Sequence, residues 1–136
     1  MIKLQIAGRI PSKKNSKQMV TFKDGRRPIL IPSAAHKKWH KEAMLELTRQ
    51  LAPKDKIEKC QVHIHIFFPD RRKADITNKV ESLMDVLVDY GVILDDAWQI
   101  VPKLVLTAEY NKEYPGANIH IIEEGEVEQE EMLMRR

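Results

Sequence analysis

The sequence has little cysteine, little glycine and no long apolar run, and each shortage excludes a class of protein. Cys60 is the only cysteine among the 136 residues, so neither an internal disulfide nor a cysteine-based zinc cluster can form. The five glycines are dispersed, so no glycine-rich phosphate loop is present and no organic cofactor is expected. No apolar segment approaches the roughly 18 to 20 residues of a membrane span, and the first residues lack the apolar core of a signal peptide. We therefore expect a cytoplasmic protein without membrane contact.

The composition that remains predicts one folded domain with a charged tail. Apolar residues make up 43% of the chain and charged residues 32%, a balance typical of a globular protein. The formal net charge of +3 is unevenly distributed, because residues 123–136 hold six Glu and two Arg, which leaves +7 on the rest. We expect a domain over residues 1–122 and an acidic tail over 123–136. A basic domain suits a phosphate backbone as partner, although solubility alone also explains such a charge.

Hydrophobic periodicity predicts the order of helices and strands. Alternation predicts a strand over 2–6 and another over 62–68, and Asp24-Gly25 predicts a hairpin between 17–22 and 27–31. Apolar residues at helical spacing predict two amphipathic helices, over 34–51 and 76–90. Two further strands are expected within 99–110 and 117–122. This order favours an α+β fold, a two-layer sandwich with two helices on a mixed or antiparallel sheet.

Most of the chemically unusual residues lie between Phe68 and Trp98. A buried strand leads into a basic loop, Asp75 precedes the second helix, and Asp95-Asp96 follows it. If that helix packs back across the strand end, Asp75 and Asp96 approach each other. Carboxylates brought together suit Mg²⁺ or Mn²⁺. From spacing alone, a helix cap at Asp75 and a turn at Asp95-Asp96 are the better explanations, because these are the common roles of aspartates at such positions.

The motifs GRIPSKKNS, DITN and GVILDDAW, in this order and separated by the predicted strands and helices, resemble the RusA-type Holliday-junction resolvases, which prophages often carry. The resemblance spans residues 1 to about 122, with Pro11 and Asn15 in the first motif, Asp75 and Asn78 in the second, and Asp95-Asp96 in the third. It implies a homodimeric endonuclease that binds four-way DNA junctions and resolves them in recombination and repair. It also implies cleavage of paired phosphodiester bonds with Mg²⁺ held by aspartates, for which Mn²⁺ can substitute.

Two departures from that family pattern affect the implied metal site. Thr77 stands where the family has a second metal-binding aspartate, and Glu81 stands where it has a lysine. Residues 77 and 81 share one helix face, and helical side chains lean toward the N-terminus. We therefore predict that Glu81 replaces the missing ligand, which gives a catalytic, metal-binding set of Asp75, Glu81 and Asp96. The alternative is a catalytically impaired relative that binds junctions as a DNA-structural protein.

Basic and polar residues around these acids are the predicted DNA contacts. They are Lys13, Lys14, Asn15 and Lys17 in the first loop, and Arg71, Arg72, Lys73, Asn78 and Lys79 near the second helix. A solvated loop is the alternative for the first group. Trp98, beside Asp96, suits either stacking on a DNA base or packing beneath the site.

Overall fold

The structure is a computed structural model that describes residues 1–13 and 17–125. All eight predicted elements are present: β1 (Ile2–Ala7), β2 (Lys17–Val20), β3 (Ile29–Pro32), α1 (Ala34–Gln50), β4 (Cys60–Phe68), α2 (Ile76–Tyr90), β5 (Lys103–Tyr110) and β6 (Gly116–Glu123). Four strands form one sheet in the order β1-β6-β4-β5, and β2 pairs with β3 separately. Only β4 and β5 run parallel among these pairs of described strands. The predicted α+β fold with a mixed sheet is confirmed.

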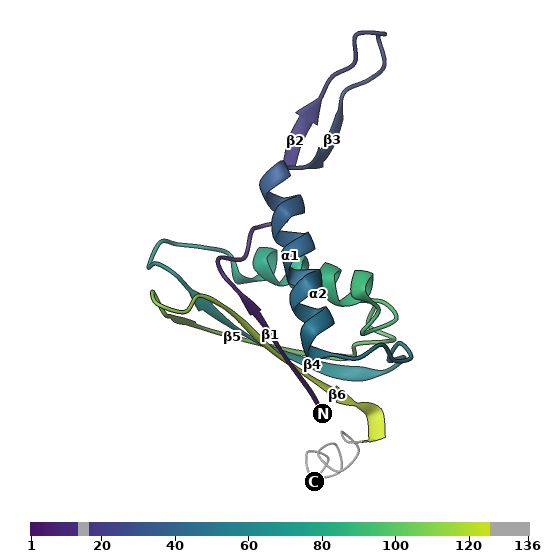
Figure 1. Cartoon of the computed structure of the whole chain (residues 1–136), viewed down its shortest axis with the longest axis vertical. Coiled ribbons are helices and arrows are strands. Elements are labelled where there is room, and N and C mark those ends of the chain that lie inside the picture. The colour runs from purple at the N-terminus through teal and green to yellow at the C-terminus, as the bar shows by residue number, and fades with distance from the viewer. Residues whose placement is uncertain (14–16, 126–136) are drawn as a thin grey trace.

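The core lies between the sheet and the two helices, which cover the same face (Figure 1). Val62, Ile64 and Ile66 alternate along β4 toward this core, and Leu83 and Leu87 on α2 are fully buried with them. The intervening side chains of the central strands point to the opposite face, since successive strand residues alternate in direction. Burial of the apolar faces of the sheet and of α2 therefore fixes the register of the sheet. It also fixes which side of α2 faces solvent and can bind a ligand.

The ends of both helices follow from local capping. The Ser33 side chain accepts a hydrogen bond from the His36 backbone N–H at 3.1 Å and begins α1. Asp75 occupies the same position for α2. Gly91 ends α2 in the left-handed conformation with φ of 90°, which glycine adopts without steric cost, and its N–H bonds the carbonyls of Leu87 and Val88.

Helix α1 also protects the exposed edge of β1. The Gln50 side chain accepts from the Gln5 N–H and donates to the Gln5 carbonyl, both at 2.7 Å. Glu46 accepts from the Ala7 N–H at 2.9 Å. These side chains bind backbone groups that an edge strand would otherwise offer to another chain.

The β2–β3 hairpin projects beyond α1, away from the four-stranded sheet (Figure 1). We call residues Lys17–Pro32 the hairpin arm. Met19 pairs with Leu30 and Val20 with Ile29. The two strands end closer to the base of the arm than predicted, and residues 21–28, which include the predicted Asp24-Gly25 turn, join them.

The predicted boundary between domain and acidic tail falls at the end of β6, which continues through Glu123. Glu123 and Glu124 form ion pairs with Lys54 and Lys59 at 3.2 and 3.4 Å, so the first two acids of that segment contact the domain. Residues 126–136 lie outside the described residues. Among the helices that the structure describes, none is long and apolar enough to cross a membrane.

Candidate active site

Acidic side chains from α2 and from the turn after it lie near one lysine, Lys13. Glu81 and Asp85 are four residues apart, so they share a face of α2. The Lys13 ammonium lies 2.9 Å from an Asp85 oxygen. Asp95 and Asp96 follow in the turn, and the Asp96 backbone N–H donates to the Asp95 carboxylate at 2.8 Å. We call Glu81, Asp85, Asp95 and Asp96 the acidic cluster.

The pKa shifts show that these groups act on one another. The hydrogen bond to Asp85 and the charges of Asp85, Glu81 and Asp96 raise the pKa of Lys13. Partial burial, the neighbouring Asp95 and then Asp85 raise the pKa of Asp96. Asp96 therefore carries its negative charge at a cost, and that charge in turn favours the protonated form of Lys13.

Asp75 lies at the other end of α2 from this turn. Its carboxylate accepts hydrogen bonds from the Thr77 backbone N–H at 3.0 Å and from the Thr77 hydroxyl at 2.7 Å. This is the capping role that its position alone predicts. Six residues separate Asp75 from Glu81, a rise of about 9 Å along the helix. Glu81 itself is exposed, so burial beside the apolar stripe gives no support for a special role.

The donors suit a divalent cation in kind. Carboxylate oxygens are the preferred ligands of Mg²⁺ and Mn²⁺. The raised pKa of Asp96 is a property often found at functional sites, whereas the ion pair with Lys13 already neutralises Asp85. Within residues 1–13 and 17–125, no three His, Cys, Asp or Glu side chains are gathered closely enough to form a complete metal-binding group.

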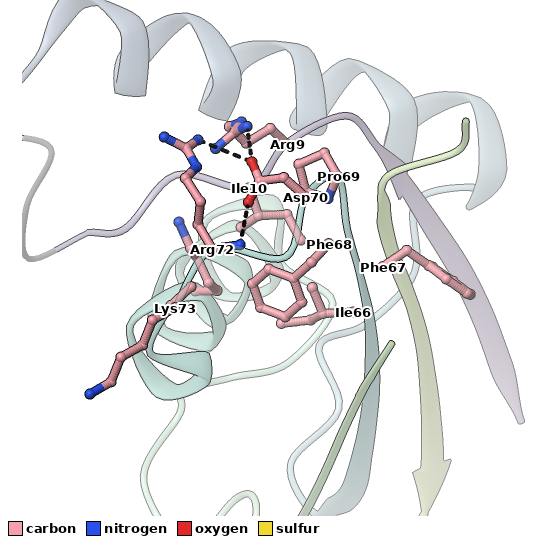
Figure 2. Close-up of a pocket in the computed structure, with 11 residues that line it drawn as sticks. Arg9, Ile10, Ile66, Phe67, Phe68, Pro69, Asp70, Arg72 and Lys73 are labelled. Atoms are coloured by element: carbon pink, nitrogen blue, oxygen red, sulfur yellow. Dashed lines mark hydrogen bonds and ion pairs between the residues drawn. The ribbon is translucent and has the colours of Figure 1, made fainter. Parts of the chain in front are cut away.

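A basic pocket of about 190 Å³ lies at the start of the loop between β4 and α2. Asp70 accepts from Arg9 at 2.6 Å and from Arg72 at 3.0 Å, so it holds both guanidinium groups together (Figure 2). Hydrogen bonds from Arg72 and Arg9 hold the pKa of Asp70 far below its usual range. Burial and the charge of Arg9 lower the pKa of Lys79, which lines the same pocket. We call Arg9, Arg72, Lys73 and Lys79 the basic pocket.

The other predicted DNA contacts are dispersed. Arg71 places its guanidinium 4.4 Å from the ring centre of Tyr110 on β5. Asn78 is half-buried on α2, and Lys17 begins β2. The predictions at Lys14 and Asn15 fall outside the described residues.

A hydrogen bond from the buried Ser82 side chain fixes the segment that carries Lys13 against α2. The Ser82 hydroxyl donates to the Pro11 carbonyl at 2.7 Å and lies 3.4 Å from the His36 ring. Because Ser82 and His36 are both buried, this contact joins the N-terminal segment, α1 and α2 next to the acidic cluster.

Sequence reasoning did not identify two of these residues. Asp85 was detectable, because four-residue spacing from Glu81 puts it on the same helix face. Arg9 gave no comparable signal, since its role depends on meeting Asp70, which is 61 residues away in the chain.

Comparison with known protein families places the chain. A protein-family model described as Endodeoxyribonuclease RusA matches residues 9–122, and thus spans both the acidic cluster and the basic pocket. No curated protein matches the chain.

Proposed function

The chain belongs to the RusA family of endodeoxyribonucleases, and we propose that it resolves four-way DNA junctions by hydrolysing phosphodiester bonds with Mg²⁺ or Mn²⁺. The observation that carries the proposal is the acidic cluster around Lys13, formed by the same helix that contributes Lys79 to the basic pocket. Acids that can hold a cation and bases that can hold phosphate are the two requirements of metal-assisted phosphodiester cleavage.

Each group has a distinct role in this proposal. Asp96 and Glu81, with Asp85 as an addition from the structure, would hold the metal, which when bound activates water and stabilises negative charge on the phosphate. Asp75 stays a predicted ligand on the strength of the family resemblance. Lys13 neutralises Asp85 before a metal binds and keeps the acids from repelling one another.

The basic pocket would orient the DNA. Asp70 holds Arg9 and Arg72 in place, so their remaining N–H groups are presented to a phosphate with little loss of side-chain freedom. A four-way junction has two-fold symmetry and two strands to cut. The proposal therefore includes a homodimer, which supplies one active site for each strand.

Cleavage of a synthetic four-way junction tests the proposal. With Mg²⁺ present, the wild type should produce paired nicks, and Asp96→Asn and Glu81→Gln should each lower the cleavage rate by at least about 100-fold, the upper range for loss of a residue that supports a metal. Asp85→Asn removes both a metal ligand and the partner of Lys13, whereas Lys13→Met removes only the ion pair. A larger loss of cleavage rate in Asp85→Asn than in Lys13→Met would therefore indicate that Asp85 binds the metal.

Asp89→Asn is the matched control. Asp89 lies one turn beyond Asp85 on α2, and its carboxylate lies 3.0 Å from the His40 ring. This variant should cleave at the wild-type rate. Full activity in Glu81→Gln would remove Glu81 from the site, and absence of Mg²⁺-dependent cleavage by the wild type would contradict the nuclease proposal.

A second candidate is a junction-binding protein without turnover. Two observations favour it. Thr77 stands at the position of a family aspartate and donates a hydrogen bond to Asp75. Lys13 forms an ion pair with Asp85, so that carboxylate is already neutralised. Junction binding that shows no cleavage with either Mg²⁺ or Mn²⁺ would support this candidate over the first.

A further inference from the structure

The hairpin arm lacks the support that the other strands have. Within the described residues, β2 pairs only with β3, and neither joins the four-stranded sheet. An isolated two-stranded hairpin is marginally stable in water. The arm also projects away from the sheet (Figure 1), so a binding partner would stabilise it more than the rest of the protein.

The ribbon of the arm exposes apolar side chains on both faces. Met19 and Leu30 lie directly opposite each other and are 59% and 62% exposed. Ile29, on the other face of the ribbon, is also exposed. Apolar groups gathered on a surface in this way mark an interaction site.

The end of the arm is basic and has little opposing charge. Lys23, Arg26 and Arg27 lie in or beside the turn, where Asp24 is the only acid. Arg26 binds Asp24 at 2.7 Å and lies 4.1 Å from the ring centre of Phe22. These bonds hold the pKa of Asp24 below its ordinary value, so the acid stays paired. The net charge of the tip is complementary to a polyanion and not to a second basic copy of the chain.

The base of the arm is fixed beside the acidic cluster. On its N-terminal side Lys13 binds Asp85. On its C-terminal side Ser33 caps α1, and His36 lies near Ser82 on α2. Each limb of about eight residues can extend roughly 25 Å at 3.3 Å per residue. That length corresponds to about seven base pairs of duplex, at 3.4 Å per pair.

We propose that the hairpin arm binds a duplex arm of the DNA substrate, up to about seven base pairs from the phosphate that is cut. The inference rests on the proposed function. A two-stranded ribbon fits the major groove, where the basic tip contacts phosphates and the apolar ribbon contacts thymine methyl groups. The arm would thereby make binding depend on the length of duplex next to the cleavage site. The acidic cluster alone does not provide this dependence.

The test compares two triple variants that lose the same charge. Lys23→Ala, Arg26→Ala and Arg27→Ala are combined in one, and exposed Lys3→Ala, Lys56→Ala and Lys112→Ala in the control. Binding of a labelled four-way junction is measured without divalent metal over a range of salt, together with hydroxyl-radical footprints. The arm variant should lower the slope of log affinity against log salt by about three per protomer, at roughly 0.9 per lost phosphate contact. It should also lose the protection farthest from the junction centre, whereas the control keeps that protection.

A variant with Lys23→Arg, Arg26→Lys and Arg27→Lys keeps the charge and should restore the wild-type footprint. If the wild type binds and cuts junctions while the arm variant keeps the full footprint, the inference is overturned and the proposed function stands. A wild type that binds no junction overturns both. An arm variant that sediments as a smaller species than the wild type would show that the arm contacts a second subunit, which also overturns the inference.

Discussion

Asp70 and Asp96 are two aspartates whose surroundings act on them in opposite ways. Two arginines bind Asp70 and stabilise its charged form, so its pKa falls. Partial burial and the adjacent Asp95 oppose ionisation of Asp96, so its pKa rises. The charged form of Asp70 therefore stabilises the fold at neutral pH. The charged form of Asp96 destabilises it until a cation binds the carboxylate.

We expect Asp96→Asn to stabilise the metal-free protein at neutral pH. An acid with a raised pKa binds more protons in the folded than in the unfolded state, so its ionisation reduces stability as pH rises through the raised pKa. The variant should therefore melt above the wild type at pH 7, and the difference should vanish near pH 3. Thermal unfolding followed by circular dichroism measures both. Added Mg²⁺ should raise the melting temperature of the wild type more than that of the variant, and equal shifts would contradict a role for Asp96 in metal binding.

Asp70→Asn should have the reverse dependence on pH. Its lowered pKa contributes stability above the ordinary aspartate value, which is lost as pH falls through the folded value. The variant should melt below the wild type at pH 7 and match it only in strong acid. Asp55→Asn, at an exposed position away from the pocket, controls for the loss of one carboxylate. A constant difference at all pH values would mean that the effect is not electrostatic.

Trp98 is expected to contact DNA. Its side chain is 73% exposed beside Asp96, which removes the alternative that it packs beneath the site. Trp98→Ala should weaken junction binding by about fivefold or more, because base stacking contributes roughly 1 to 3 kcal/mol, and Trp98→Phe should retain most of the affinity. Tyr114→Ala removes an aromatic that is 75% exposed in the β5–β6 turn and should bind as the wild type does.

Single residues were predictable where their role is local. Asp75 as a cap and Gly91 as a helix end follow from the positions of their neighbours in the chain. The salt bridge of Lys13 with Asp85 and the joining of Arg9 with Asp70 depend on segments about 60 to 70 residues apart. Hydrophobic periodicity does not predict contacts between residues so far apart in the sequence.

At the level of elements, the pairing of β1 with β6 depends on Gly116. Gly116 has φ of 147°, and a Cβ atom there would lie 2.3 Å from the Ile6 carbonyl oxygen. Gly116→Ala should therefore lower the free energy of unfolding by roughly 3 kcal/mol, as measured by urea denaturation. Gly8→Ala, which has φ of 90° and open space around it, should cost about 1 to 2 kcal/mol. Equal losses would mean that backbone conformation, and not the close approach, accounts for the effect.

The existence of each element followed from hydrophobic periodicity and the helix ends followed from capping, because both act within a few residues. The hairpin strands are shifted by about two residues from their predicted bounds at the turn. Strand order did not follow from either. The local patterns that predict β4 and β5 contain no information on their parallel pairing, which requires α2 to cross between them. The separation of the hairpin arm from the main sheet was equally hidden, since its pattern is that of any hairpin.

For the molecule as a whole, charge should govern affinity for DNA. Residues 126–136 carry four Glu and two Arg, so removing them raises the formal net charge from +3 to +5. The shortened protein should bind duplex DNA several-fold more tightly at low salt, because the basic domain attracts the backbone without competition. Replacing the four Glu by Gln keeps the length and should reproduce the gain. Unchanged affinity in both would mean that the tail does not screen the DNA-binding face.

The strand order also dictates when the sheet can be completed during synthesis. Of the strands that the structure describes, β1 is translated first and its partner β6 last, and β6 also separates β1 from β4. Leu4 and Ile6 must therefore remain without their final neighbours until more than a hundred further residues have been translated. A nascent chain that stalls before Gly116 leaves β1 unpaired, and its apolar side chains favour aggregation until β6 has been made.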